Sequence, residues 1–427
     1  MIRKVAMSAM GLVFIGSSVF AQSLADAKNA IDAERYQSAK SMLKNLTVTQ
    51  PTKDENFFYL GWVYLIQDHI DSAKLQFNKG IAVEPKSALN YVGLGAVARL
   101  SKDPAGATAN FNKAIELAPR KDADPYLYIG KSYLLPIGGS TTVTPADAAA
   151  AISILQKAKE NDKKLKNADI DITLGNAELS QLKSSDADSH YSEAIADDPK
   201  SLPAYVAKGA LLRMAHNWDG AVEKFKAALA IDPNFGPAYR EWAETDYRQA
   251  NSDRSVASVK IKEAVDHYKK YLDLTDRSLE SQLRYADFLI NAGDYKSLQE
   301  VASTLASSAN SNPRVYRYLG YAAYENKDYT AAMAAMNNWF AKAEPARILP
   351  SDYMYLGRIQ IASGKDTTAG LANLKKAVTM DSTKAEDVYN TDIIPLYKAK
   401  KDYLNLAKSY EELINLSPGK PMLNERF

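Results

Sequence analysis

The 427-residue chain contains no cysteine. Disulfide bonds therefore cannot stabilise the fold, and no lipid can be attached through an N-terminal cysteine. Histidine is also scarce, with four residues in different parts of the chain: His69, His190, His216 and His267. None of them belongs to an H-E-x-x-H motif or has a carboxylate at metal-ligand spacing on a shared face, and no G-x-S-x-G motif is present. We therefore expect a non-enzymatic protein with no metal and no cofactor.

An excess of charge of one sign is also missing. The sequence has 53 basic and 51 acidic residues, and its formal net charge is +2. Removing Arg3 and Lys4 leaves 51 residues of each kind. This balance gives no indication of binding to nucleic acid or to an anionic membrane. With 46% hydrophobic and 24% charged residues, the chain can still bury a large core.

One nearly all-apolar stretch lies at the start of the chain. Arg3 and Lys4 precede a nearly all-apolar run, Val5 to Phe20, and Ala21 completes a small-residue cleavage site before Gln22. Residues 1–21 are therefore predicted to be a signal peptide that is cleaved after Ala21. The alternative is an uncleaved anchor, but the stretch is short and no stop-transfer pattern follows. The mature chain is expected to be periplasmic or secreted, with no integral membrane segment.

A repeat runs through the rest of the sequence. Its first copy contains Phe57, Leu60, Gly61, Tyr64, Ala73, Phe77 and Pro85. The same frame returns 34 residues later as Tyr91, Leu94, Gly95, Ala98, Ala107, Phe111 and Pro119. Further copies follow, with Leu174, Gly175, Ala187, Tyr191 and Pro199 and then with Tyr205, Gly209, Ala221, Phe225 and Pro233. Because several offsets agree at once in every copy, the repeat is a specific signal.

The repeat also has a physical explanation. Apolar residues at i, i+3, i+4 and i+7 give one face of a helix, and a small residue such as Gly61 allows a second helix to approach closely. Proline then ends the second helix, as at Glu84-Pro85 and Asp232-Pro233. No single unit can bury both of its faces, so the units must stack into a solenoid.

This pattern resembles the tetratricopeptide repeat (TPR) family, whose unit is a helix, a turn and a second helix. The resemblance covers essentially all of residues 22–427 and implies an all-α fold, a right-handed TPR superhelix (α-solenoid) of about eleven helix-turn-helix repeats. The expected units begin near Leu24, Asp54, Ala88, Lys121, Ala168, Leu202, Gly236, Glu280, Pro313, Pro350 and Asp387. The last unit is expected to be a capping pair with a polar outer face.

The repeat also explains two apparent nucleotide-binding motifs. Gly93, Gly95 and Ala98 fit G-x-G-x-x-G/A, but a dinucleotide-binding turn requires a strand before the glycines. Here the glycines lie within the first helix of a repeat. Gly130-Lys131-Ser132 resembles the end of a phosphate-binding loop, yet Pro125 stands where that loop needs glycine.

The period breaks at two places. Residues 136–147 form an insertion in the fourth unit, with a Gly138-Gly139 loop and a helix N-cap at Thr144. The insertion is either a binding loop or a tolerated surface feature. In the seventh unit, added residues around 251–258 predict a lengthened second helix and a candidate bend. We therefore predict an N-terminal TPR array at 22–250 and a C-terminal array at 251–427.

The resemblance implies that residues beside the packing positions of the first helices line a concave groove. In this sequence the expected groove residues are Phe58, Trp62, Leu65, Val92, Arg240, Glu244, Tyr247, Arg317, Tyr321, Tyr324 and Arg358. Aromatic residues and arginine are enriched where proteins and peptides are anchored. For Phe58 and Trp62 the alternative is packing against the adjoining N-terminal unit. The lysine and asparagine clamp of chaperone-tail-binding TPR proteins is absent, because Phe58, Trp62, Val92 and Ala96 stand at its positions.

The expected function is that of an interaction scaffold in the cell envelope of a Gram-negative bacterium, which binds a protein or peptide segment in its groove. A carbohydrate-binding protein is the alternative, in which Trp62 and tyrosines would stack on sugar rings. Most tyrosines, however, stand at the aromatic packing position that opens each first helix, as Tyr91 and Tyr205 do. The partner and the oligomeric state do not follow from the sequence.

Overall fold

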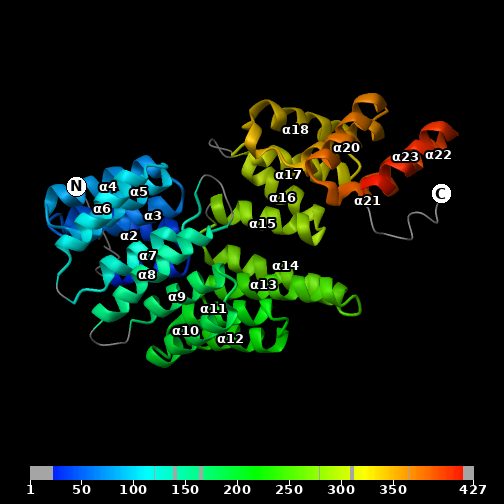
Figure 1. Cartoon of the computed structure of the whole chain (residues 1–427). Helices are drawn as coiled ribbons and strands as arrows, with labels where there is room; N and C mark the ends of the chain where they lie inside the picture. Colours follow the sequence, from blue (N-terminus) through cyan, green and yellow to red (C-terminus); the bar gives the residue numbers. More distant parts are fainter. Residues whose placement is uncertain are drawn as a thin grey trace, which may run out of the picture. The chain divides into compact units, whose positions relative to one another are not determined.

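The computed structural model describes residues 23–119, 121–137, 142–162, 167–277, 279–307, 312–364 and 366–416. These residues form helices joined by short turns, with no strand among them (Figure 1). No helix within these ranges has the length and hydropathy needed to cross a membrane. The predicted signal peptide lies outside the described residues. The fold is an all-α solenoid, as the repeat predicts.

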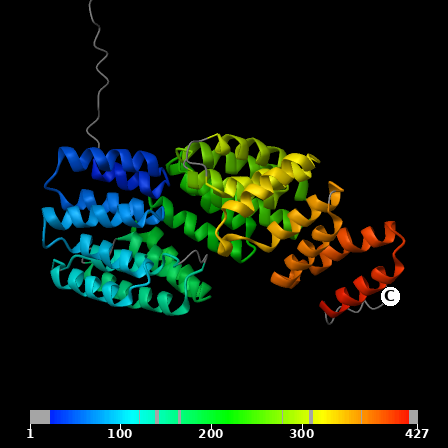
Figure 2. The same cartoon turned by 90° about the horizontal axis from the view of Figure 1, so that it is seen from above.

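Successive helices form antiparallel pairs, which appear as layers at the blue and cyan end of Figure 2. The first six pairs are α1 (Leu24–Asp32) with α2 (Tyr36–Thr49), α3 (Asp54–Ile66) with α4 (Ile70–Val83), α5 (Ala88–Leu100) with α6 (Pro104–Leu117), α7 (Asp124–Tyr133) with α8 (Pro145–Asn161), α9 (Ala168–Ser180) with α10 (Ser184–Asp197), and α11 (Leu202–Met214) with α12 (Trp218–Ile231).

The later pairs are less uniform. They are α13 (Gly236–Ser252) with α14 (Ala257–Leu274), α15 (Leu279–Ala292) with α16 (Tyr295–Ala306), α17 (Arg314–Glu325) with α18 (Tyr329–Lys342), and α19 (Pro350–Ala362) with α20 (Thr367–Met380). The chain then continues through α21 (Ala385–Val388), a π-helix (Tyr389–Ile393), α22 (Ile394–Ala399) and α23 (Tyr403–Leu416). Each predicted unit start lies within three residues of a helix start.

Close approach of paired helices depends on the small residues of the repeat. The ring of Phe77 on α4 lies between Gly61 on α3 and Gly93 on α5. A Cβ atom at Gly61 would lie 2.5 Å from this ring, and one at Gly93 would lie 2.4 Å from it. A methyl group therefore does not fit at either position unless the ring moves.

The insertion of the fourth unit is held at both ends. The Thr144 hydroxyl accepts the N–H of Asp147, which confirms the predicted N-cap of α8. The buried Arg99 guanidinium of α5 donates to the carbonyl oxygens of Ser132 and Leu135 before the insertion, at 2.9 and 2.8 Å. It also pairs with Asp147, the last residue of the insertion, at 3.0 Å. Residues Gly138 and Gly139 lie outside the described residues.

The seventh and the last units differ from expectation in detail. In the seventh unit both helices are long, because α13 has 17 residues and α14 has 18, so the added chain is shared between them. The outer face of α23 is not uniformly polar, since Tyr403 and Leu404 are 69% and 68% exposed.

The described chain divides into two compact units. Unit 1 comprises residues 23–245 with 274–276, and unit 2 comprises 246–273 with the described residues from Arg277 to Leu416. The division falls inside α13.

Unit 1 is closed by contacts between residues far apart in the sequence. Glu34, in the turn after α1, pairs with Arg240 of α13 at 3.2 Å. The backbone N–H and hydroxyl of Ser38, in the first turn of α2, donate to the Asp276 carboxylate at 3.0 and 2.9 Å. A carboxylate at this position stabilises the α2 N-terminus through its unpaired N–H groups and its dipole. The α1–α2 hairpin is thus fixed against the far end of unit 1.

Candidate functional site

At the N-terminal end of the array, the residues predicted to line the groove lie in the core. Phe58 and Val92 are 0% exposed, Leu65 is 2% exposed and Trp62 is 6% exposed. These side chains present no open surface to a partner, and the prediction for them is wrong on this point. Packing, the alternative for Phe58 and Trp62, is what the structure shows, although the packing partner comes from farther along the chain.

The cause is the curvature of unit 1. The ring of Tyr128, on α7, lies 4.9 Å from the ring of Phe58 and 5.0 Å from that of Trp62, both on α3. Helices α3 and α7 are the first helices of the second and fourth units, which are not adjacent in the array. Their side chains nevertheless meet on its inner side. The Tyr128 side chain therefore covers Phe58 and Trp62, although α5 is the helix that packs against both α3 and α7. The glycan alternative loses its main support, because the Trp62 ring is packed between protein rings.

The predicted groove residues of α13 have partners inside the protein. Arg240 pairs with Glu34 at 3.2 Å and with Glu241 at 2.8 Å. Glu244 is half-buried and has a protein partner. Tyr247 is half-buried, with its ring 5.8 Å from that of Phe288. Arg240 therefore serves the closure of unit 1 in this structure.

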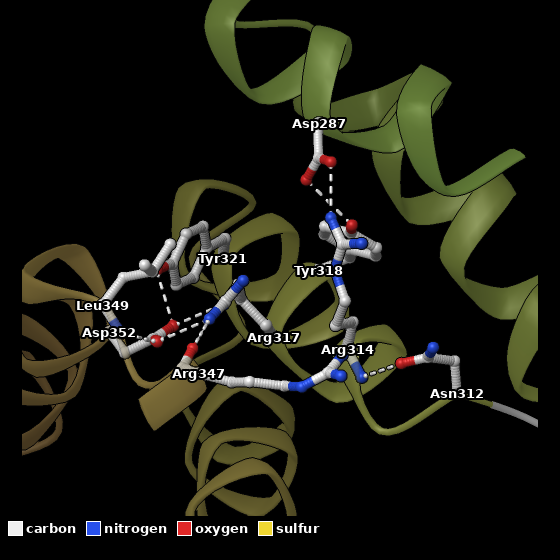
Figure 3. A network of polar contacts seen from close by, with 9 residues as sticks. All are labelled: Asp287, Asn312, Arg314, Arg317, Tyr318, Tyr321, Arg347, Leu349 and Asp352. Carbon is white, nitrogen blue, oxygen red and sulfur yellow. Dashed lines mark hydrogen bonds and ion pairs between the residues drawn. The ribbon is translucent and has the colours of Figure 1, made fainter. Parts of the chain in front are cut away.

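The predicted residues of α17 form part of the core of unit 2. Arg317 is 6% exposed and its guanidinium binds the Asp352 carboxylate at 2.7 and 2.9 Å (Figure 3). It also lies 4.4 Å from the centre of the Trp339 ring. The hydroxyl of the buried Tyr321 donates to the same carboxylate at 2.8 Å. Neither Arg317 nor Tyr321 is accessible to a partner, so the prediction of a groove surface at these two positions is wrong.

The two remaining predicted residues are partly accessible. Tyr324 is half-buried, with its ring 5.6 Å from that of Tyr355. The side chain of Arg358 is 11% exposed and pairs with Asp392 at 2.9 Å and Asp387 at 3.0 Å. The eleven predicted positions thus do not form one open groove.

A different set of side chains meets on the inner side of unit 1. We call it the inner-face cluster, and it consists of Lys28, Asp32, Glu55, Tyr59, Asp124, Tyr128, Lys131 and Asp169. Its members come from α1, α3, α7 and α9, the first helices of four units. Lys131 binds Asp169 at 2.9 Å. The Lys28 ammonium lies 5.0 Å from the centre of the Tyr59 ring, and that of Lys131 lies 5.1 Å from the centre of the Tyr128 ring.

Negative charge is in excess in this cluster, which has four carboxylates and two ammonium groups. Burial and the neighbouring Asp169 raise the pKa of Asp32 to about 6, although Lys131 and Lys28 oppose this shift. Burial and neighbouring carboxylates also raise the pKa of Glu55 and of Asp124. Burial opposes the charge of both lysines, yet neighbouring anionic groups raise their pKa values. Only Asp169 has a lowered pKa, because Lys131 binds it.

A pocket of about 490 Å³ adjoins the cluster. Its wall consists of the end of α1, the turn before α2, the starts of α9 and α11, and the turn between α12 and α13. The charged residues in the wall are Asp32, Arg35, Asp169, Asp198, Lys200 and Asp232. Asp198 and Asp232 are the acidic residues of the Asp-Pro pairs that end second helices, so the repeat itself brings carboxylates to this edge.

Two polar groups in the pocket wall have no partner among the described residues. The Asp32 carboxylate is exposed to the pocket and forms no hydrogen bond or ion pair with them. The Nε of Arg35 is buried and likewise has no hydrogen-bond acceptor there. Neither residue was among the predicted groove residues, because both lie at a helix end and the predicted residues were chosen from the faces of helices. The recurrence of acidic residues at helix ends was the available signal.

A second cluster contradicts the expectation that the histidines stand apart from carboxylates. His190 and Glu193 of α10 gather with Asp171 of α9, so that their ligand atoms lie within 4.8 Å of one another. The Lys159 ammonium, however, binds Asp171 at 2.8 Å and Glu193 at 2.6 Å. A cation of the protein itself therefore neutralises these carboxylates, and we assign the cluster to the packing of α8, α9 and α10.

Comparisons with known proteins agree with the repeat. Residues 172–234 match the model of the family described as tetratricopeptide repeat. No curated protein matches the chain. A solved tetratricopeptide repeat protein from Parabacteroides merdae is 17% identical, with a TM-score of 0.42, over 63% of this chain and 97% of that one. PilF of Pseudomonas aeruginosa is 16% identical, with a TM-score of 0.35, over 55% of this chain and 97% of that one.

A third structure, the APC/C hetero-tetramer Cut9–Hcn1, contains a chain that is 13% identical, with a TM-score of 0.39, over 95% of this chain and 96% of that one. The residues that match the family model extend from α9 to α12. These helices form two consecutive pairs, and similar helix pairs precede and follow them. The chain therefore contains tetratricopeptide repeats.

Proposed function

We propose that the protein is a non-enzymatic scaffold of the bacterial cell envelope, which binds a segment of a partner polypeptide at the pocket of unit 1. Tetratricopeptide-repeat proteins bind protein or peptide partners, and the fold is typically a non-catalytic scaffold. The observation that carries the proposal is the pocket itself. The side chains predicted to line the groove are buried, half-buried or paired, whereas here charged and polar side chains line an open volume.

A pocket-filling substitution tests the binding site. The full chain is used to select binders from a library of random peptides, and their affinities are then measured for Asn29→Trp. Asn29 is exposed and lines the pocket, so an indole there should occupy part of its volume and weaken binding by about tenfold or more. Lys74→Trp, at an exposed position of α4, is the matched control and should leave binding unchanged. Equal affinities for the two variants would reject the pocket as the binding site.

The envelope location is supported by residues 1–21, which have the composition of a signal peptide. Sequencing the N-terminus of the protein recovered from the envelope fraction checks this part of the proposal. A first residue of Gln22 is expected. Recovery of the intact N-terminus from the cytoplasmic fraction would contradict it.

A further inference from the structure

The pocket of unit 1 lies between two parts of the chain that are far apart in the sequence. Its first wall is the end of α1 with the turn before α2, and its second wall is the starts of α9 and α11 with the turn before α13. We infer that docking of the α1–α2 hairpin against α13 completes this pocket, so that docking and partner binding stabilise each other. The inference rests on the proposed function and adds the regulation of the same site.

The two sides of the hairpin are attached by different kinds of contact. Towards α3 and α4, five of its apolar side chains lie in one large buried cluster: Ala27, Ala30, Ala39, Leu43 and Leu46. In the buried cluster of α11 to α13, its one member among the described residues is Ala33. On that side Ser38 donates two hydrogen bonds to Asp276, and Glu34 forms an ion pair with α13. Apolar burial stabilises in proportion to its area, whereas partly exposed ion pairs contribute little. The attachment to α13 is therefore the weaker one, and the hairpin can leave α13 while it stays packed on α3.

Docking also supplies the N-terminal cap of α2. The N-cap residue, Arg35, has no side-chain acceptor for a backbone N–H. The Asp276 carboxylate instead accepts the N–H of Ser38, the third residue of the helix, at 3.0 Å. It thus takes the place of an N-cap side chain, and its charge is favourable at the positive end of the helix. Because Arg35 precedes this turn and lines the pocket, the first wall of the pocket depends on the same contact.

The coupling follows from where the closing contacts lie. Glu34, Ser38, Arg240 and Asp276 hold the hairpin in place, but none of them is among the residues that line the pocket. A bound segment contacts both walls only while the hairpin is docked. Its apparent affinity is therefore reduced by the fraction of molecules in which the hairpin is undocked, and its binding in turn favours the docked state. These four residues are positioning residues, which act on the partner through the hairpin.

A substitution that removes a closing contact outside the pocket tests the coupling. Asp276 has a φ of 60°, which glycine adopts without strain, so Asp276→Gly removes the carboxylate and allows the same backbone path. It should weaken the peptides selected from the random library by about fivefold or more, measured by fluorescence anisotropy with the full chain. Arg277→Gly is the matched control, because Arg277 also has a positive φ, of 47°, and its side chain pairs with Asp273. It should leave binding unchanged.

The absence of cysteine allows docking to be restored covalently. Ser38→Cys combined with Asp276→Cys removes both hydrogen bonds of the carboxylate, and a short bifunctional maleimide can then join the two thiols. The double variant should bind about fivefold or more weakly than the parent before cross-linking. After cross-linking its affinity should return to at least that of the parent, because the hairpin is held in the docked position. Each single-cysteine variant, treated with the same reagent, controls for the modification itself.

Hydrogen exchange reports docking without relying on affinity. In the parent, a bound peptide should slow exchange in α1 and in the first turn of α2 by about fivefold or more. In the free chain, Asp276→Gly should speed exchange in the first turn of α2 and leave α4 unchanged.

The outcomes separate the coupling from the binding site. Parent-like affinity of Asp276→Gly, failure of the cross-link to restore binding, or equal exchange of α1 in the free and bound chain would each overturn the inference. If Asn29→Trp weakens the selected peptides while Asp276→Gly does not, the proposed function holds and the coupling fails. If Asn29→Trp weakens no selected peptide, the proposed function fails.

Discussion

Arg317→Met is expected to destabilise unit 2 by about 3–5 kcal/mol. The methionine retains most of the apolar contact with Trp339 but removes the charge. Asp352, which is 0% exposed, would then lose its ion pair and keep only the hydrogen bonds from Tyr321 and from the backbone N–H of Leu349. An uncompensated carboxylate in the interior causes most of the cost. Hydrogen exchange of the full chain, read in peptides from α17 to α19, measures the local free energy of opening.

Two variants separate the buried pair from an exposed one. Arg347→Ala removes a pair with Glu344 in which the side chains are 57% and 76% exposed, and it should cost at most about 1 kcal/mol. Arg317→Met combined with Asp352→Asn should recover part of the loss, because the amide keeps an acceptor oxygen without the charge. If Arg317→Met were as mild as Arg347→Ala, Arg317 would be free to serve a partner, as the sequence suggested.

Helix starts and pairing could be predicted because the repeat fixes them locally. The 34-residue frame places its small residues and prolines at constant offsets, and each of these has a short-range cause. The orientation of individual side chains was harder to predict. In α3 the sequence from Asn56 to Val63 is buried on every side, so it contains no polar stripe that could mark an inner face. Phe58 and Trp62 therefore looked like groove residues.

The site depends on the curvature of the array, which no single repeat determines. Tyr128 covers Trp62 only because α3 and α7 approach each other on the inner side, and Asp32 meets Asp169 only because the N-terminal hairpin closes unit 1. Both contacts join residues from different repeats. The sequence contains the acidic residues of these helix ends, but their convergence is a property of the assembled array.

The glycine–phenylalanine contact shows how closely that array is packed. Phe77→Ala is expected to destabilise unit 1 by about 3–5 kcal/mol, because Phe77 is fully buried and its ring separates α3 from α5. Gly61→Ala should cost about 1–3 kcal/mol, since the new methyl group overlaps the same ring. Each repeat contacts mainly its neighbours, so hydrogen-exchange protection should fall in α3 to α5 and less in α11 and α12.

The combined variant gives the stricter test of this packing. In the double variant Gly61→Ala with Phe77→Ala, the methyl group enters the space that the ring has left. The double variant should therefore be less destabilised than the sum of the two single variants, by at least about 1 kcal/mol. Leu75→Ala on the same helix removes a side chain that is 53% exposed and should change stability by no more than about 0.5 kcal/mol. Strict additivity of Gly61→Ala and Phe77→Ala would mean that the glycine is required for backbone freedom, and that close approach of the ring is not the reason for its place in the repeat.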